Sequence, residues 1–334
     1  MRLSILDYVP IFEGRNATQA INHSIELAQL AESLEFYRFW IAEHHKVFSV
    51  ASSAPEMLMM TLLENTKTMH IGSGGVMLPH YSAYKIAEIF KIMEARHSDR
   101  VDLGIGRSYS FKNVNHALNE NKTAHVDFNT QIKDLIDYFN DNSEHQRFTG
   151  LYATPFIQTQ PTMYLLGTSQ QSAKLAAQQG LPFVTTLMGQ NKDKINTSIS
   201  YYRQLFKTLY PKQSPYVIIS TFVITADNMQ KVKDLERAFH LWLLRISYLN
   251  QPKTYPSIAY AKQRQSSNRE LEKIKQNEKR VISGLPGEVF LKLQEIATYY
   301  NADEIMIQPH VFAEQNRKNL LYLLASEKDK FEST

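Results

Sequence analysis

The sequence contains no cysteine among its 334 residues. That absence excludes disulfides, zinc–thiolate sites, iron–sulfur clusters and a cysteine nucleophile. Charge of one sign is also scarce: 37 basic and 33 acidic side chains leave a net charge of +4, whereas a nucleic-acid-binding face needs clustered basic residues. No apolar run approaches the ~20 residues of a membrane span, and the first residues lack the apolar core of a signal peptide. We therefore expect a cytoplasmic protein that binds neither nucleic acid nor membrane.

Short apolar runs alternate with longer amphipathic ones along the chain. The runs typical of strands occupy residues 2–8, 37–42, 69–78, 100–107, 162–167, 182–186, 216–225 and 302–308. Helical spacing of apolar residues occurs at 17–36, 54–66, 82–97, 123–142, 169–180, 191–209, 227–249, 286–300 and 312–326. Alternation predicts a parallel sheet, because each strand needs a crossover to reach the next. Eight such strands favour an α/β fold of one domain over residues 1–334, a closed (β/α)8 TIM barrel, above an open doubly wound sheet.

One segment does not follow this alternation. Residues 250–285, after the seventh predicted strand, are polar and too long for a simple loop between a strand and a helix. Two interpretations remain open: a solvated insertion, or a mobile lid over the barrel mouth.

The second predicted strand ends in Glu43, His44 and His45. In a barrel, catalytic groups come from the C-terminal ends of the strands. Alternation sends His44 to one face of the strand and Glu43 and His45 to the other. Adjacent residues of a strand point in different directions, and no third ligand follows at a recognisable spacing, so the sequence argues against a metal site here. Taken alone, one such histidine is either a catalyst or a structural residue.

Three further strand ends carry residues that suit ligand binding. Gly74 and Gly75 end the third strand, where glycine allows close approach to a flat ligand, or simply a tight turn. Arg107 ends the fourth strand as a candidate anion clamp or a surface ion pair. Ser169 and Ser172 begin a helix directly after a strand, as a phosphate cradle or a plain N-cap. Together the four strand ends suit a phosphorylated planar cofactor across the barrel mouth.

These motifs, in this order and at these separations, resemble the bacterial luciferase-like flavin monooxygenases. They are RFWIAEHH (38–45), IGSGGVMLP (71–79), RVDLGIGR (100–107), GTSQQSAKLAAQQGLP (167–182) and, for the last strand, ADEIMIQ (302–308). The likeness extends from residue 1 to about residue 325 and is weakest in 110–160 and 245–285.

The resemblance implies a barrel that binds FMN at its C-terminal mouth. His44 matches the histidine credited with promoting formation or breakdown of a flavin hydroperoxide. Gly74 and Gly75 match a pair joined by a non-prolyl cis peptide beneath the isoalloxazine. The phosphate-binding positions of the family fall on Arg107, Tyr109, Thr168, Ser169 and Ser172.

The sequence also departs from the family pattern. A second basic phosphate ligand is expected near residues 120–130, where Lys122 and His125 are candidates. Asp99 stands where many relatives have glycine, which alters a turn but no evident ligand. The substrate loops diverge most, so no substrate is carried over.

The function implied is that of a two-component monooxygenase. Reduced FMN from a separate flavin reductase reacts with O₂, and the 4a-hydroperoxide oxidises a small organic substrate. No GxGxxG motif for a nicotinamide cofactor follows the first strand, in keeping with a partner reductase. His44 exchanges protons near neutral pH, and Glu43 and His45 buttress His44 and the loop and do not meet the substrate. Deazaflavin-dependent hydride transfer and non-catalytic FMN binding are the alternatives, and the resemblance implies a homodimer.

Overall fold

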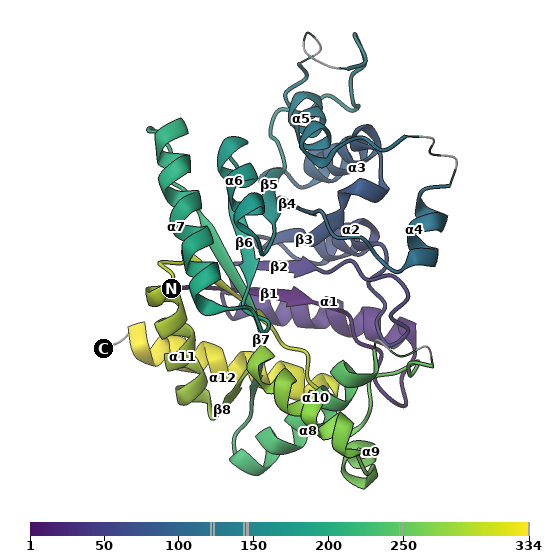
Figure 1. Cartoon of the computed structure of the whole chain (residues 1–334), viewed down its shortest axis with the longest axis vertical. Coiled ribbons are helices and arrows are strands. Elements are labelled where there is room, and N and C mark those ends of the chain that lie inside the picture. The colour runs from purple at the N-terminus through teal and green to yellow at the C-terminus, as the bar shows by residue number, and fades with distance from the viewer. Residues whose placement is uncertain are drawn as a thin grey trace.

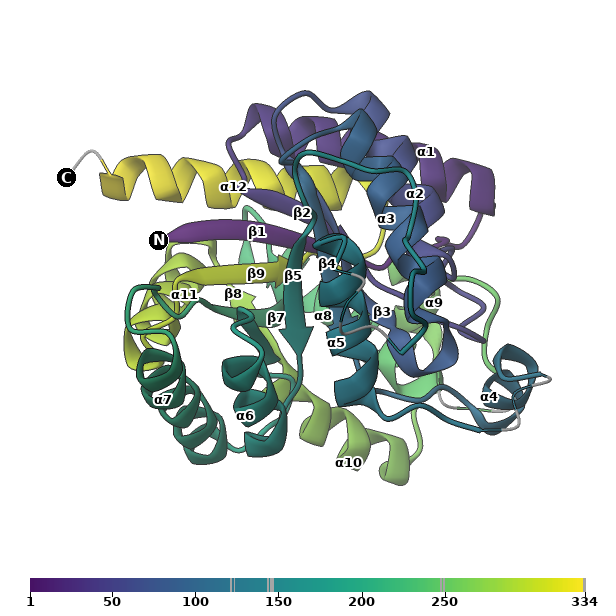
Figure 2. The ribbon, with the colours of Figure 1, turned by 90° about the horizontal axis from the view of Figure 1, so that it is seen from above.

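A closed ring of parallel strands forms the centre of the molecule (Figures 1 and 2). The computed structural model describes residues 1–332 except 121, 123, 143, 145, 146, 247 and 249. The ring runs in the order β1 (Arg2–Asp7), β2 (Arg38–Ile41), β3 (His70–Met77), β4 (Val101–Gly106), β5 (Thr162–Leu166), β6 (Phe183–Thr186), β7 (Val217–Thr225) and β9 (Glu304–Gln308). It closes because β9 pairs with β1 as well as with β7. The predicted (β/α)8 barrel is therefore confirmed.

Helices surround the strands on the outside of the ring (Figure 1). They are α1 (Ala17–Ser33), α2 (Pro55–Asn65), α3 (Ala83–Arg96), α5 (Phe128–Phe139), α6 (Gln170–Gln178), α7 (Lys192–Leu209), α8 (Met229–Arg245), α11 (Pro286–Tyr299) and α12 (Glu314–Glu332). Many begin at a side chain that accepts a hydrogen bond from the third amide, as Asn16, Ser82, Asp127 and Asn228 do. Among the described helices, none is both long and apolar enough to cross a membrane.

A buried ion network fills the barrel near the start of its strands. Arg38 donates hydrogen bonds to Asp102 at 2.6 Å, to Glu304 at 2.8 Å and to the Tyr164 hydroxyl at 2.7 Å. Trp40 lies one layer higher and donates from Nε1 to Asp102 at 2.9 Å. These contacts fill the barrel below Trp40, and the Trp40 ring lines the main cavity above them.

Glycines on the neighbouring strands make room for the Trp40 ring. A Cβ on Gly72 would lie 2.4 Å from Trp40 Nε1, and one on Gly104 would lie 3.2 Å from Trp40 Cζ3. The glycines of β3 and β4 therefore allow one large aromatic side chain to span the barrel interior.

Two helix predictions differ from the structure at their ends. The helix expected over 123–142 begins at Phe128, because Asp127 caps it, and a short helix α4 (Lys112–Leu118) precedes it unpredicted. The helix expected over 227–249 ends at Arg245. Residues 123 and 249 lie outside the described part of the chain.

The segment after β7 is a folded insertion. It contains α9 (Ile258–Gln263), α10 (Asn268–Asn277) and an unpredicted strand β8 (Val281–Gly284). β8 pairs with the last four residues of β7, Phe222 to Thr225, and only Phe222 of these is also in register with β9. Gln251 and Tyr255 bond the loops after β2 and β1. No described residue of 250–285 lines the main cavity, so this conformation gives the insertion no lid role.

Candidate functional site

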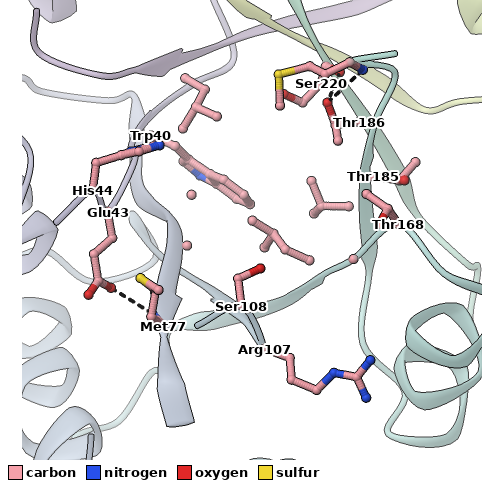
Figure 3. A pocket seen from close by; sticks show the side chains of 18 of the residues that line it. Trp40, Glu43, His44, Met77, Arg107, Ser108, Thr168, Thr185, Thr186 and Ser220 are labelled. Carbon is pink, nitrogen blue, oxygen red and sulfur yellow. Dashed lines mark hydrogen bonds between the residues drawn. The ribbon is translucent and has the colours of Figure 1, made fainter. Parts of the chain in front are cut away.

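A cavity of about 650 Å³ opens at the C-terminal ends of the strands. Figure 3 shows it with Glu43 and His44 on one wall and Thr168, Thr185, Thr186 and Ser220 on the opposite wall. Nine residues predicted from the sequence line this one cavity: Glu43, His44, Gly74, Gly75, Arg107, Tyr109, Thr168, Ser169 and Ser172. Residues far apart in the sequence thus meet in one place, as expected for strand ends of a barrel.

The glycine pair of β3 forms a part of the wall without side chains. The peptide bond between Gly74 and Gly75 is cis, as the resemblance implies. A Cβ on Gly74 would lie 2.4 Å from Leu6 Cδ1, and one on Gly75 would lie 2.7 Å from the Gly104 carbonyl oxygen. Gly75 requires glycine because the backbone of β4 already occupies that space, whereas at Gly74 the Leu6 side chain would have to move.

Hydrogen-bond donors gather where β5 runs into α6. Ser169 Oγ accepts a hydrogen bond from the Ser172 amide at 3.2 Å and lies 3.1 Å from Ser172 Oγ. A Cβ on Gly167 would lie 2.4 Å from Ser172 Oγ, so glycine is required beside this hydroxyl. The first amides of a helix have no partner within it, and its dipole favours an anion there. The structure confirms that Ser169 is an N-cap, and the phosphate cradle at this junction stays a prediction.

Arg107, directly after β4, adds a further hydrogen-bond donor beside the first turn of α6. Its side chain is exposed, and Nη1 donates to Gln171 Oε1 in the first turn of α6 at 3.5 Å. Tyr109 is 60% exposed, and its ring meets the His80 ring edge-on at 5.5 Å. Among the described residues that line the cavity, Glu43 alone has a carboxylate, and it lies on the wall opposite Thr168 (Figure 3). The α6 end is therefore a cluster of donors that favours an anion.

His44 is partly buried at the end of β2, with its ring 4.5 Å from the Tyr8 ring. Burial lowers the pKa of His44 to about 4, although the nearby Glu43 carboxylate opposes this change. Its Nδ1 is buried and has no hydrogen-bond partner among the described residues. The expectation of a histidine that titrates near neutrality is therefore corrected: His44 is a neutral imidazole at pH 7.

Glu43 does not bond His44. Its carboxylate accepts hydrogen bonds from the Met77 amide at 2.7 Å, from the Tyr81 hydroxyl at 2.5 Å and from His45 Nε2 at 2.7 Å. Alternation along the strand turns Glu43 and His45 to the other face from His44, so the hydrogen bonds of Glu43 support the loop after β2 and the end of β3 and not the imidazole of His44. Glu43 instead joins the end of β2 to the end of β3.

The two candidates for a second basic phosphate ligand lie elsewhere. Lys122 and His125 line a separate cavity of about 260 Å³ that also includes Arg147. Lys122 Nζ donates to the His80 carbonyl at 2.6 Å. Neither candidate reaches the α6 end of the main cavity.

Sequence reasoning missed several residues of the cavity wall. They include Tyr8, Trp40, Met77, Ser108, Thr185, Thr186, Ser220, Met306 and Gln308. Period-two alternation within the predicted strands could have found Tyr8, which follows Leu6 on the same face, and Gln308, which follows Met306. Within the described residues, no group of three His, Asp or Glu side chains is placed to hold a metal ion.

Comparison with known proteins places these features in a family. The sequence profile of the luciferase-like monooxygenases matches residues 1–297. A luciferase-like monooxygenase of Escherichia coli K12 is 32% identical over 330 residues, which cover 98% of this chain and 96% of the relative. An N-acetyl-S-alkylcysteine monooxygenase of Bacillus subtilis is 40% identical over 187 residues, 55% of this chain and 56% of the relative.

Solved structures share the fold over nearly the whole chain. Apo-MsnO8 superposes with a TM-score of 0.85 at 29% identity and covers 98% of both chains. The oxygenating constituent of 3,6-diketocamphane monooxygenase from Pseudomonas putida, in complex with FMN, has a TM-score of 0.67 at 17% identity, over 98% of this chain and 97% of that chain. At that identity the second likeness concerns the fold alone.

Proposed function

Because this chain belongs to the luciferase-like monooxygenase family, we propose that it uses reduced FMN and O₂ to oxidise a small organic substrate. The observation that carries the proposal is one cavity with a carboxylate-free cluster of hydrogen-bond donors at the α6 end and a neutral imidazole, His44, on another wall. The first feature suits a phosphate, and the second suits proton handling away from bulk water.

The residues present fit FMN. Ser169, Ser172 and the first amides of α6 would hold the phosphate, with Arg107 adding a positive charge beside it. Gly74 and Gly75 would face the ring, since no side chain projects from either. Bound reduced FMN supplies the two electrons that activate O₂, and the protein supplies orientation and exclusion of water.

His44 and Glu43 have different roles in this proposal. The neutral His44 imidazole offers a nitrogen that accepts a hydrogen bond, because burial disfavours its charged form. Glu43 acts through structure: by bonding the Met77 amide and Tyr81 it fixes the strand end that carries the glycine pair. The apolar wall of Leu6, Trp40 and Met306 limits water around the ring.

The overall reaction needs neither a metal nor a nicotinamide cofactor bound to this chain. One oxygen atom of O₂ goes to the substrate and the other leaves as water, while reduced FMN gives up two electrons and two protons. A separate flavin reductase supplies the reduced FMN. We expect a homodimer, which sedimentation equilibrium tests directly.

Thioethers are the first substrates to examine. A relative identical at 40% of 187 positions is named an N-acetyl-S-alkylcysteine monooxygenase. Sulfur oxidation of such a compound gives a sulfoxide and consumes one oxygen atom.

The proposal is tested by flavin titration followed by turnover. We expect quenching of FMN fluorescence on binding, and sulfoxide formation from N-acetyl-S-benzylcysteine when reduced FMN and O₂ are supplied. Tight binding of deazaflavin F420 with no FMN binding would replace the proposal by hydride transfer. If the protein binds FMN, oxidises none of the thioethers tested and consumes no O₂ with any other substrate, it would be a flavin-binding protein without catalytic activity.

A further inference from the structure

Two buried side chains on β7 and β9 bond each other at the wall of the main cavity. Gln308 Nε2 donates a hydrogen bond to Ser220 Oγ, and both residues line the cavity. Gln308 is 1% exposed and Ser220 is 5% exposed. Figure 3 shows Ser220 beside Thr186, on the wall opposite Glu43 and His44. Ser220 and Gln308 are therefore a polar pair held at a defined place in the cavity wall.

Gln308 carries an acceptor that the protein leaves without a partner. Its Oε1 is buried and forms no hydrogen bond with a described residue. The large majority of buried polar side-chain atoms have a partner, because an unsatisfied one destabilises the fold. Since Gln308 lines the cavity, a molecule bound there can supply the missing donor.

Ser220 offers a donor at the same place. A serine hydroxyl has one proton to donate, and Gln308 Nε2 uses only the acceptor side of Ser220 Oγ. No described residue accepts a hydrogen bond from Ser220 Oγ. Thr186 differs, because its hydroxyl donates to the Ser220 carbonyl at 3.1 Å. The pair thus presents one donor and one acceptor to a ligand.

The pair is uncharged, which limits the ligand groups that suit it. Among the described residues that line the cavity, the Glu43 carboxylate follows β2 and the Arg107 guanidinium follows β4, so neither lies on the strands of the pair. Burying a charge without an opposite charge is costly. The pair therefore favours a neutral group over a carboxylate or a phosphate.

We propose that Ser220 and Gln308 form a subsite for an amide edge, in which a C=O and an N–H lie side by side. The ligand carbonyl accepts from the Ser220 hydroxyl, and the ligand N–H donates to Gln308 Oε1. Gln308 Nε2 lies between these two atoms along the chain of bonds, so the ligand needs its acceptor and its donor on separate atoms. A primary amide and a cyclic imide meet this requirement, whereas in a trans secondary amide the two groups point apart.

Two molecules of the proposed reaction can carry such an edge. One is the flavin, in its pyrimidine ring, and the other is an organic substrate with a primary amide or a lactam. The inference rests on the proposed function only for the choice between them. The pair lies on β7 and β9, whereas Ser169 and Ser172 follow β5, so the subsite is separate from the donor cluster at α6.

Benzamide and N,N-dimethylbenzamide test the subsite without knowledge of the natural ligand, because only benzamide has N–H groups. Calorimetric titration into FMN-free protein measures both affinities. We expect benzamide to bind about tenfold more tightly, a ratio that one hydrogen bond supports. Gln308→Met removes this preference, because it removes the acceptor of the N–H. Ser220→Ala weakens both amides to a similar extent, because both have a carbonyl.

Matched variants locate the effect. Ser108→Ala removes a hydroxyl from another wall of the same cavity and leaves both affinities unchanged. Gln308→Met keeps the melting temperature of the free protein close to that of the wild type, because it removes an unsatisfied acceptor together with one hydrogen bond. Equal affinity of the wild type for the two amides, or a wild-type preference in Gln308→Met, would overturn the inference.

The same titrations on FMN-loaded protein identify the ligand. A preference for benzamide that persists assigns the subsite to the organic substrate. In 3-methylriboflavin a methyl group replaces the edge N–H. A preference that disappears, together with riboflavin binding about tenfold more tightly than 3-methylriboflavin, assigns the subsite to the flavin; disappearance without that difference would also overturn the inference.

Fluorescence titration with FMN reports separately on the proposed function. Absence of FMN binding with an intact preference for benzamide rejects only the cofactor. FMN binding in a protein without that preference rejects only the subsite.

Discussion

The Glu43 carboxylate accepts a hydrogen bond from the backbone amide of Met77 at 2.7 Å, which ties the end of β2 to the end of β3. Tyr81 donates to the same carboxylate at 2.5 Å from beyond β3. One acidic side chain therefore fixes the position of the strand that carries Gly74 and Gly75, while His44, next to it in the sequence, faces another part of the cavity.

Removing the Tyr81 hydroxyl tests this tie. Tyr81→Phe is expected to lower the free energy of unfolding by about 2 kcal/mol, because a hydrogen bond to a buried carboxylate is stronger than one between neutral groups. Urea denaturation measures the change, with Tyr322→Phe at an exposed position as the control. Equal free energies of unfolding for the two variants would show that the hydrogen bond from Tyr81 to Glu43 does not stabilise the fold.

The glycines of the cavity wall differ in what they tolerate. Gly75→Ala is expected to destabilise the protein by about 1–3 kcal/mol, because overpacking forces the backbone to shift and the new Cβ would lie 2.7 Å from the Gly104 carbonyl oxygen. Gly106→Ala is the matched control, since a Cβ there meets nothing within 4 Å. Thermal unfolding should separate the two variants clearly. A Gly75→Ala protein as stable as Gly106→Ala would contradict the close packing of β3 on β4.

Arg107 should matter for FMN and not for riboflavin. Arg107→Met is expected to weaken FMN binding about tenfold, as loss of one charge-assisted contact at an exposed site would, and to leave riboflavin affinity unchanged because riboflavin has no phosphate. Fluorescence titration of both ligands against both proteins isolates the phosphate contribution. A parallel loss for riboflavin would place Arg107 against the ring or the ribityl chain.

The lowered pKa of His44 predicts a pH dependence of stability. Its folded-state pKa is about 4, below the ordinary value of 6.5, so between these values the unfolded chain binds more protons than the folded one. Stability is therefore complete above pH 6.5 and falls as the pH falls toward 4. By this linkage, acidification from pH 7 to pH 5 should cost the wild type about 2 kcal/mol more than His44→Gln. Urea denaturation at the two pH values measures the difference, and equal losses would mean that His44 titrates normally.

The barrel and the location of the site were predictable because both depend on local patterns. Eight apolar runs separated by amphipathic helices define the strands, and strand ends of a parallel barrel must meet. β8 was missed because its four residues, Val281 to Gly284, carry only two large apolar side chains and pair with β7 alone. No period in the sequence indicates such a strand.

Properties that arise from long-range contacts could not be predicted. Two of the three partners of Glu43, Met77 and Tyr81, lie 34 and 38 residues away, so its role depends on the packing of β2 against β3. The pKa of His44 depends on its burial in the folded protein, which the local sequence does not show. Lys122 is basic and lies at the expected position in the sequence, yet its loop turns it to the His80 carbonyl.

The most direct test of the monooxygenase proposal uses isotopic oxygen. Protein loaded with reduced FMN and N-acetyl-S-benzylcysteine is mixed with ¹⁸O₂ in a single turnover, and the product is analysed by mass spectrometry. The account predicts a sulfoxide that carries one ¹⁸O atom, with FMN reoxidised in equal amount. Unlabelled thioether recovered intact, with all of the oxygen converted to hydrogen peroxide, would contradict it.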